Sequence, residues 1–95
     1  MARGYEVVAR TWRCRGGELD LVVRQGKTLV FCEVKARGGQ AFGAPAEAVT
    51  RAKQARIRRL AAAWLREEAP RRAATIRFDV VSVLRGALEV IEGAF

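Results

Sequence analysis

Four charged side chains interrupt two otherwise apolar segments, and they are the residues whose types best suit chemistry. The segments are "ELDLVV" and "TLVFCEVKA", and the four residues are Glu18, Asp20, Glu33 and Lys35. Charged groups in a buried sheet cost free energy unless they pair with one another or bind a ligand. Carboxylates are typical ligands of Mg²⁺. A neighbouring lysine suits phosphodiester hydrolysis, in which it can orient or deprotonate the attacking water.

The spacing of these residues predicts that two of them meet. The letters "QGK" at residues 25–27 predict a short hairpin turn between two antiparallel strands. Side chains on one face of such a pair lie within about 5 Å of each other across the ladder. Asp20 and Glu33 can therefore reach one divalent ion, and Lys35 follows Glu33 on the same face. The alternative is structural: Glu33 and Lys35 point to solvent from a one-sided sheet, and Asp20 pairs with an arginine.

The composition excludes several other kinds of site. The chain has no histidine and two cysteines, so it offers neither a histidine general base nor the four Cys or His ligands of an ordinary zinc site. We expect Cys14 and Cys32 to be inert, buried thiols. Lysine and arginine number 18 against 10 Asp and Glu, for a net charge of +8. Such an excess attracts polyanions, including nucleic acid.

The length and hydropathy predict one compact domain. With 95 residues the chain fits a single domain, residues 1–95. The sequence has no apolar run of roughly 18 residues and no signal-peptide pattern, so we expect a cytoplasmic protein with no membrane association.

The elements that position the charged residues follow from periodicity, and they predict a mixed α/β (α+β) fold. We expect strands at 5–12, 18–23 and 28–36, a Gly-rich loop at 38–48, a helix from the N-cap Thr50 to Pro70, a strand at 75–84 and a C-terminal edge hairpin. Strict alternation in 18–23 places Leu19, Leu21 and Val23 on one face and Glu18, Asp20 and Val22 on the other. Asp79 is expected to pair with Arg77 or another arginine; the alternative is that it approaches the acidic cluster from a neighbouring strand.

The predicted helix has one apolar face and one arginine face. At about 100° per residue the apolar arc contains Val49, Ile57, Leu60, Ala61, Trp64 and Leu65, and the opposite arc contains Arg51, Arg56, Arg59 and Arg66. Lys53 and Gln54 lie in or beside the apolar arc in the first turn, so something polar should lie beneath that end. We expect Lys53, Arg56, Arg59 and Arg37 to contact a nucleic-acid backbone; the alternative is an ordinary solvated surface.

Five segments together resemble a known family: "RGYEVVARTWRCRGGELDLVV", "LVFCEVKAR", "AFGAPAEAVTRAKQARI", "RFDVV" and "IEGAF". Their order and spacing are similar to those of the bacterial YraN-like family, in the Holliday-junction-resolvase-like branch of the PD-(D/E)xK nuclease superfamily. The resemblance covers nearly the whole chain. It implies a restriction endonuclease-like core, with a mixed central sheet, an acidic hairpin and a packed basic helix.

The resemblance also implies roles by position. Asp20 and Glu33 would bind the metal, with the backbone carbonyl of Val34 as a further ligand, and Lys35 would assist the nucleophile. Gln54 takes the place of a helix glutamine found near the site in some branches. Relatives carry a further helix ahead of "RGY", on which related resolvases often place a metal-binding Glu, whereas this sequence opens almost at "RGY". Either the start is short or that ligand is missing. Glu18 would partly replace it, or is a surface residue paired with an arginine.

These observations predict an endonuclease-like protein that uses one or two Mg²⁺ or Mn²⁺ ions to hydrolyse phosphodiesters of DNA, including branched DNA. The first alternative is a catalytically silent nucleic-acid-binding module of the same fold. The second is an assembly protein whose basic face binds an acidic partner. DNA is expected over RNA, and a two-fold homodimer would suit a junction substrate.

Overall fold

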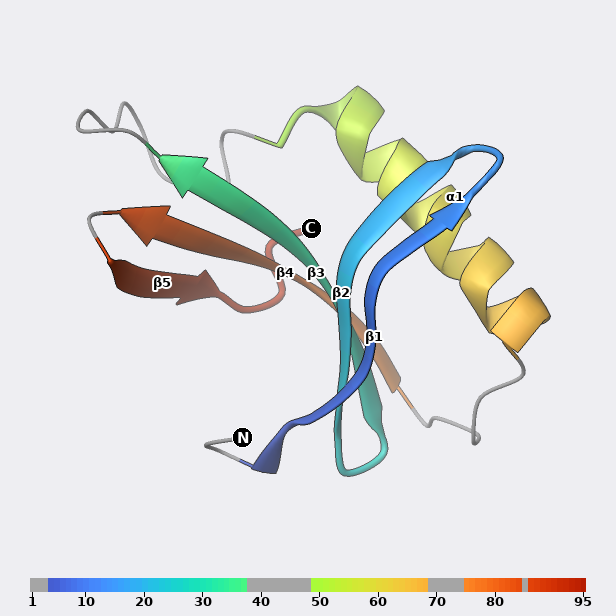
Figure 1. Cartoon of the computed structure of the whole chain (residues 1–95), viewed down its shortest axis with the longest axis horizontal. Helices are drawn as coiled ribbons and strands as arrows, with labels where there is room; N and C mark the ends of the chain where they lie inside the picture. Colours follow the sequence, from blue (N-terminus) through green and yellow to red (C-terminus); the bar gives the residue numbers. More distant parts are fainter. Residues whose placement is uncertain (1–3, 38–48, 69–74, 85) are drawn as a thin grey trace.

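A five-stranded sheet carries one long helix on one of its faces (Figure 1). The computed structural model describes residues 4–37, 49–68, 75–84 and 86–95. The predicted Gly-rich loop at 38–48 lies outside the described residues. The elements are β1 (Glu6–Cys14), β2 (Gly17–Gln25), β3 (Thr28–Arg37), α1 (Arg51–Glu68), β4 (Thr75–Leu84) and β5 (Ala87–Ile91). Their types and order confirm the predicted mixed α/β class, three strands before the helix and a hairpin after it.

The strands lie in the sheet in chain order, β1-β2-β3-β4-β5. Three of the neighbouring pairs are antiparallel, and β3 and β4 are parallel because the chain crosses over through α1 between them. The turn between β2 and β3 has two residues, and its Gly26 has a φ of 59°, a left-handed conformation that glycine adopts without strain. The predicted hairpin at "QGK" is therefore confirmed.

The main core lies between α1 and the sheet. Ile57, Leu60, Ala61 and Trp64 are the buried residues of α1, as the predicted apolar arc requires. They pack on side chains from β2, β3 and β4, among them Val22, Phe31 and Val80. The rings of Phe31 and Trp64 meet edge to face, with centroids 5.8 Å apart and planes at 81°. None of the helices in the described ranges is long and apolar enough to cross a membrane.

The predicted strict alternation in β2 is wrong at Leu19. Leu19 belongs to the same core cluster as Val22, three positions away, whereas Leu21 packs on the opposite side of the sheet. Across the ladder, Trp12 is paired with Leu19 and also packs against the helix side. Thr11 lies between the Arg10–Leu21 pair and the Trp12–Leu19 pair of the ladder, and its φ of 45° is unusual for a β-branched residue. Because alternation needs extended backbone at every position, this left-handed residue turns the end of the hairpin over α1.

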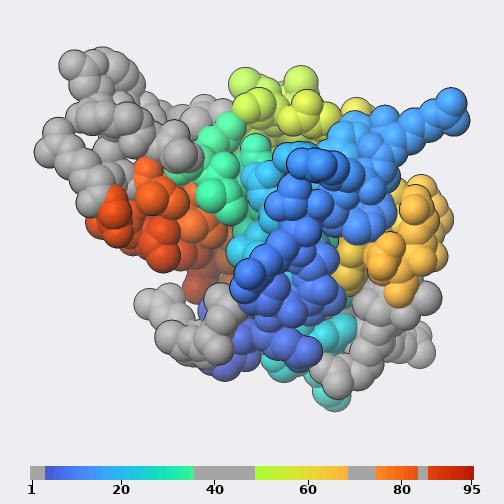
Figure 2. All heavy atoms as spheres, in the orientation of Figure 1, coloured from blue at the N-terminus to red at the C-terminus, as the bar shows by residue number. Residues whose placement is uncertain are grey.

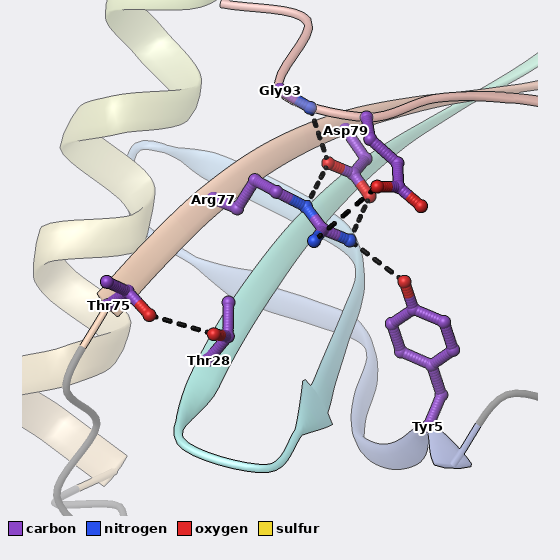
Figure 3. A network of polar contacts seen from close by, with 7 residues as sticks. Tyr5, Thr28, Thr75, Arg77, Asp79 and Gly93 are labelled. Carbon is purple, nitrogen blue, oxygen red and sulfur yellow. Dashed lines mark hydrogen bonds and ion pairs between the residues drawn. The ribbon is translucent and has the colours of Figure 1, made fainter.

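On the face of the sheet away from α1, a polar network joins β4 to both ends of the described chain (Figure 3). The Arg77 guanidinium donates from Nε to Asp79 Oδ1 at 2.9 Å and from Nη2 to Asp79 Oδ2 at 3.0 Å, and Nη2 also lies 2.9 Å from the Tyr5 hydroxyl. The backbone N–H of Gly93 donates to Asp79 Oδ1 at 3.0 Å. The predicted pairing of Asp79 with Arg77 is thus confirmed, and the buried carboxylate has a structural explanation.

Both cysteines are free thiols, as predicted, but they differ in burial. Cys32 is buried on β3, whereas Cys14 at the end of β1 is half-buried. Burial, followed by the nearby Asp79 charge, raises the pKa of the Cys32 thiol to about 12. Cys32 therefore stays protonated and inert at neutral pH.

Candidate functional site

The candidate site forms where β2 and β3 stop pairing. Their ladder runs from the turn to the Leu21–Cys32 pair, and Asp20 is the next residue of β2. There the Asp20 side chain takes the place of a backbone partner, because its Oδ2 accepts a hydrogen bond of 2.9 Å from the backbone N–H of Val34. This bond holds the carboxylate between the two strands, beside Glu33.

Glu33 is the most perturbed carboxylate of the site. Its pKa is raised above the ordinary value of 4.5, first by burial and then by a hydrogen bond to Asp20 and by the Asp20 charge. Lys35 and Lys53 act in the opposite direction, but more weakly. The Lys35 ammonium lies 3.6 Å from Glu33 Oε2, and both side chains are largely covered. Two carboxylates and a lysine therefore share one partly desolvated space, and the carboxylates repel each other there.

A second lysine reaches this space from the first turn of α1. The Thr50 hydroxyl caps the helix by accepting a hydrogen bond of 3.2 Å from the backbone N–H of Lys53, which confirms the predicted N-cap. The pKa of Lys53 is lowered, mainly because the Lys35 side chain lies close to it and carries the same charge, and Glu33 partly opposes this shift. The polar first turn of the helix thus lies over a polar group of side chains, as its sequence predicted.

Other residues predicted for the site lie in different surroundings. Glu18 forms an exposed ion pair with Arg13 at 3.1 Å, so its carboxylate is engaged outside the cluster. This agrees with the alternative prediction that Glu18 is a surface residue paired with an arginine. The Gln54 amide donates to the backbone carbonyl of Val49 at 3.1 Å and so secures the entry to the helix. The Arg37 side chain lies outside the described part of the chain, and its contact with nucleic acid stays a prediction.

One contributor could not be read from the sequence. The donor that holds Asp20 is the backbone N–H of Val34, and backbone donors carry no residue type. The only available signal was indirect: in a two-residue hairpin the register places position 20 opposite position 33, next to Val34.

The structure contains two ionic clusters with opposite electrostatics. In the network of Figure 3, hydrogen bonds to Asp79 and to Tyr5 raise the pKa of Arg77, so the protein stabilises that charge. In the site, the protein disfavours the charge of Glu33 and the charge of Lys53. An ionic cluster that serves only stability favours its charges. A cluster that disfavours them has the signature of a binding or catalytic site.

Comparison with known proteins identifies the family. The family model described as "Uncharacterised protein family UPF0102" matches residues 1–83. The chain is 63% identical over 84 residues to a UPF0102 protein of Beutenbergia cavernae, covering 88% of this chain and 70% of the relative. It is 54% identical over 99 residues to a UPF0102 protein of Frankia casuarinae, covering 99% and 83%. With a UPF0102 protein of Acidothermus cellulolyticus it shares 49% identity over 106 residues, covering 97% and 80%. The chain therefore belongs to the UPF0102 family, which the YraN-like resemblance of its motifs had indicated.

Proposed function

We propose that this protein is a magnesium- or manganese-dependent endonuclease that hydrolyses phosphodiester bonds of nucleic acid, DNA in preference to RNA. The observation that carries the proposal is the electrostatics of the site. Burial and then the neighbouring Asp20 raise the pKa of Glu33, and Lys35 lowers the pKa of Lys53. A divalent cation beside the carboxylates and a phosphate beside the lysines would relieve both repulsions at once.

The donor set of the site fits a hard divalent ion. Within the described ranges no group of three or more His, Cys, Asp or Glu side chains could hold a metal. Magnesium commonly needs only one or two carboxylates, since waters and phosphate oxygens complete its coordination. Asp20 and Glu33 would hold the ion, with the backbone carbonyl of Val34 as the proposed further ligand. The ion would supply positive charge at the scissile phosphate and lower the pKa of a water there.

The residues of the chain have distinct roles in this hydrolysis. Val34 fixes the Asp20 carboxylate through its N–H, so that Asp20 does not have to be ordered when substrate binds. Lys35, held 3.6 Å from Glu33, would orient or deprotonate the attacking water and offset the charge that develops on the phosphate. Lys53 would bind a phosphate oxygen from the helix side. The water oxygen bonds to phosphorus, the bridging P–O bond breaks, and a phosphate monoester and a hydroxyl are released.

The strongest competing function is a silent nucleic-acid-binding module of the same fold. It is favoured by the small ligand set, because the described part of the site contributes two carboxylates where related resolvases often add a further Glu. The arrangement of an acidic hairpin under a basic helix suits both functions, and fold resemblance does not separate them. The two functions differ in what removal of a carboxylate does.

The decisive experiment measures cleavage with matched variants. Purified protein is incubated with labelled four-way, flap, single-stranded and duplex DNA and with matched RNA, in Mg²⁺, Mn²⁺ or EDTA. We expect metal-dependent cutting that Asp20→Asn and Glu33→Gln abolish. Glu18→Gln is the matched control, because it removes a carboxylate from the same strand but one that pairs with Arg13 outside the cluster. Binding without cutting, equal in all four proteins, would instead establish the silent module.

A further inference from the structure

A hollow lies between the β1–β2 turn and one flank of α1. Its volume is about 240 Å³, and it is bordered by Arg15 and Gly16 of the turn and by Arg56, Arg59 and Ala63 of the helix. Figure 1 shows the turn crossing α1, and in Figure 2 the same turn projects from the body of the molecule above the end of the helix. We call this hollow the arginine groove.

The turn that borders the groove contains two glycines, which lie near Leu60 of the helix. A Cβ atom built on Gly16 would lie 3.6 Å from Leu60 Cδ2, and one built on Gly17 would lie 3.5 Å from Leu60 Cδ1. A Cβ at either position would thus meet Leu60 at ordinary van der Waals distance, and Leu60 also lines the groove. Gly17 has a φ of 138°, which side chains rarely tolerate, so the turn needs glycine there.

The three arginines have no acidic partner among the described residues. The ion pairs of the described chain involve Arg13, Lys35 and Arg77, and none involves Arg15, Arg56 or Arg59. Arginine side chains can form paired hydrogen bonds with phosphate oxygens. One carboxylate, that of Glu67, borders the groove. The charge balance of the groove thus favours an anion.

The arginine groove continues from the candidate site along the helix. Lys53 lies in the first turn of α1, above the site, and Arg56 follows it by three residues, so the two side chains are neighbours on the helix surface. Arg59 lies six residues after Lys53, which is about 9 Å along a helix. A nucleic-acid strand rises about 3.4 Å per nucleotide, so this distance corresponds to about two to three nucleotides.

We propose that the arginine groove binds the backbone phosphates of the substrate strand, about two to three nucleotides from the phosphate held at Asp20 and Glu33. This inference rests on the proposed function, and it adds the path of the strand across the protein. The strand leaves the carboxylates past Lys53 and runs between the β1–β2 turn and α1. The contacts are to phosphates, so they position the strand without selecting its sequence.

The test uses two alanines of the same helix as a matched pair. Ala63 borders the groove, four residues after Arg59, and Ala62 lies beside Arg58 on the other flank. Ala63→Glu would pair with Arg59 and fill the groove, whereas Ala62→Glu adds the same charge and could pair with Arg58. Binding is measured in Glu33→Gln protein, which is not expected to cut, on DNA of about 20 nucleotides at several salt concentrations. We expect Ala63→Glu to weaken binding by about fivefold or more and to lower the salt slope by about one, and Ala62→Glu to change neither.

A second pair keeps the proposal testable if Ala63→Glu does not fold. Arg56→Ala with Arg59→Ala removes two of the three groove cations, and Arg66→Ala removes an exposed cation that does not border the groove. DNA trimmed to fewer than three nucleotides on the groove side should bind the groove variants and their controls equally.

Equal weakening by both members of each pair would overturn the groove, as would failure of the parent protein to bind any nucleic acid. Cleavage by the wild-type protein is measured separately. Cleavage without a difference between the paired variants would reject the groove and keep the nuclease, whereas a difference in binding without cleavage would keep the groove and reject the nuclease.

Discussion

Replacing Asp79 by asparagine should cost the protein a large part of its stability. The Asp79 side chain is 3% exposed and accepts hydrogen bonds from Arg77 and from the backbone of Gly93. Asparagine has nearly the same shape, but it lacks the charge and turns an amide N–H₂ towards donors. Arg77 would then remain largely covered without its main counterion.

The magnitude follows from how well water can reach the pair. Breaking a fully buried ion pair costs about 3–5 kcal/mol. The Arg77 side chain is 25% exposed, so water recovers part of that loss, and we expect Asp79→Asn to lower the free energy of unfolding by about 2–4 kcal/mol. For a chain of 95 residues this corresponds to a fall in Tm of about 10–20 °C.

Glu92 provides the matched control, because it also faces Arg77. Its Oε1 lies 3.8 Å from Arg77 Nη1, and its side chain is 52% exposed, so Glu92→Gln should cost less than about 0.5 kcal/mol. Urea unfolding followed by circular dichroism measures both variants. A cost below about 1 kcal/mol for Asp79→Asn, or equal costs for the two variants, would refute the role of Asp79 as the buried counterion that stabilises Arg77.

Three further predictions concern the site and the thiols. The folded protein raises the pKa of Glu33 above 4.5, so ionisation of Glu33 destabilises the fold as the pH rises through and above that value. Glu33→Gln should therefore raise the free energy of unfolding at pH 7.5 in EDTA. This gain should disappear below about pH 4, as measured by urea titrations at each pH. Asp20→Asn keeps a side-chain oxygen that can accept the hydrogen bond from the Val34 N–H. The free energy of unfolding of this variant should therefore stay within about 1 kcal/mol of the wild-type value while cleavage is lost. Unfolding of the variant would contradict the assigned contact. Alkylation at pH 8 followed by mass spectrometry should modify Cys14 but leave Cys32, whose pKa is about 12, untouched until urea is added.

Local chemistry made most of the fold predictable. Gly26 marks a turn that only a few conformations satisfy, and Thr50 supplies the hydroxyl that a helix start requires. The two-residue turn also sets the register of β2 and β3, which carries the site: if Gln25 pairs with Thr28, Asp20 comes opposite Glu33. These features depend on residues close together in the sequence, so the sequence alone indicates them.

The features that escaped prediction depend on packing between distant segments. Leu19 turns to the helix side because Thr11, on another strand, adopts a left-handed conformation, and no residue type signals that departure. The contact between Lys35 and Lys53 requires α1 to pack across the sheet at one particular position. The polar first turn of α1 predicted that some polar group would lie there, but not that it would be another ammonium group.

The like-charged neighbours Lys35 and Lys53, together with Asp20 and Glu33, support the function proposed for this site. Two ammonium groups held together gain nothing for the free protein, and the same is true of Asp20 beside Glu33. If the cluster served only stability, one lysine and one carboxylate would suffice and would form an ion pair like that of Arg77 and Asp79. Lys35 pairs with Glu33 at 3.6 Å, but each carboxylate keeps a second carboxylate beside it and each lysine a second lysine. A phosphodiester bound with a divalent cation would place an opposite charge beside each of these like-charged pairs. The same account predicts that saturating Mg²⁺ raises the free energy of unfolding of the wild-type protein more than that of Glu33→Gln, and an equal effect on both proteins would contradict it.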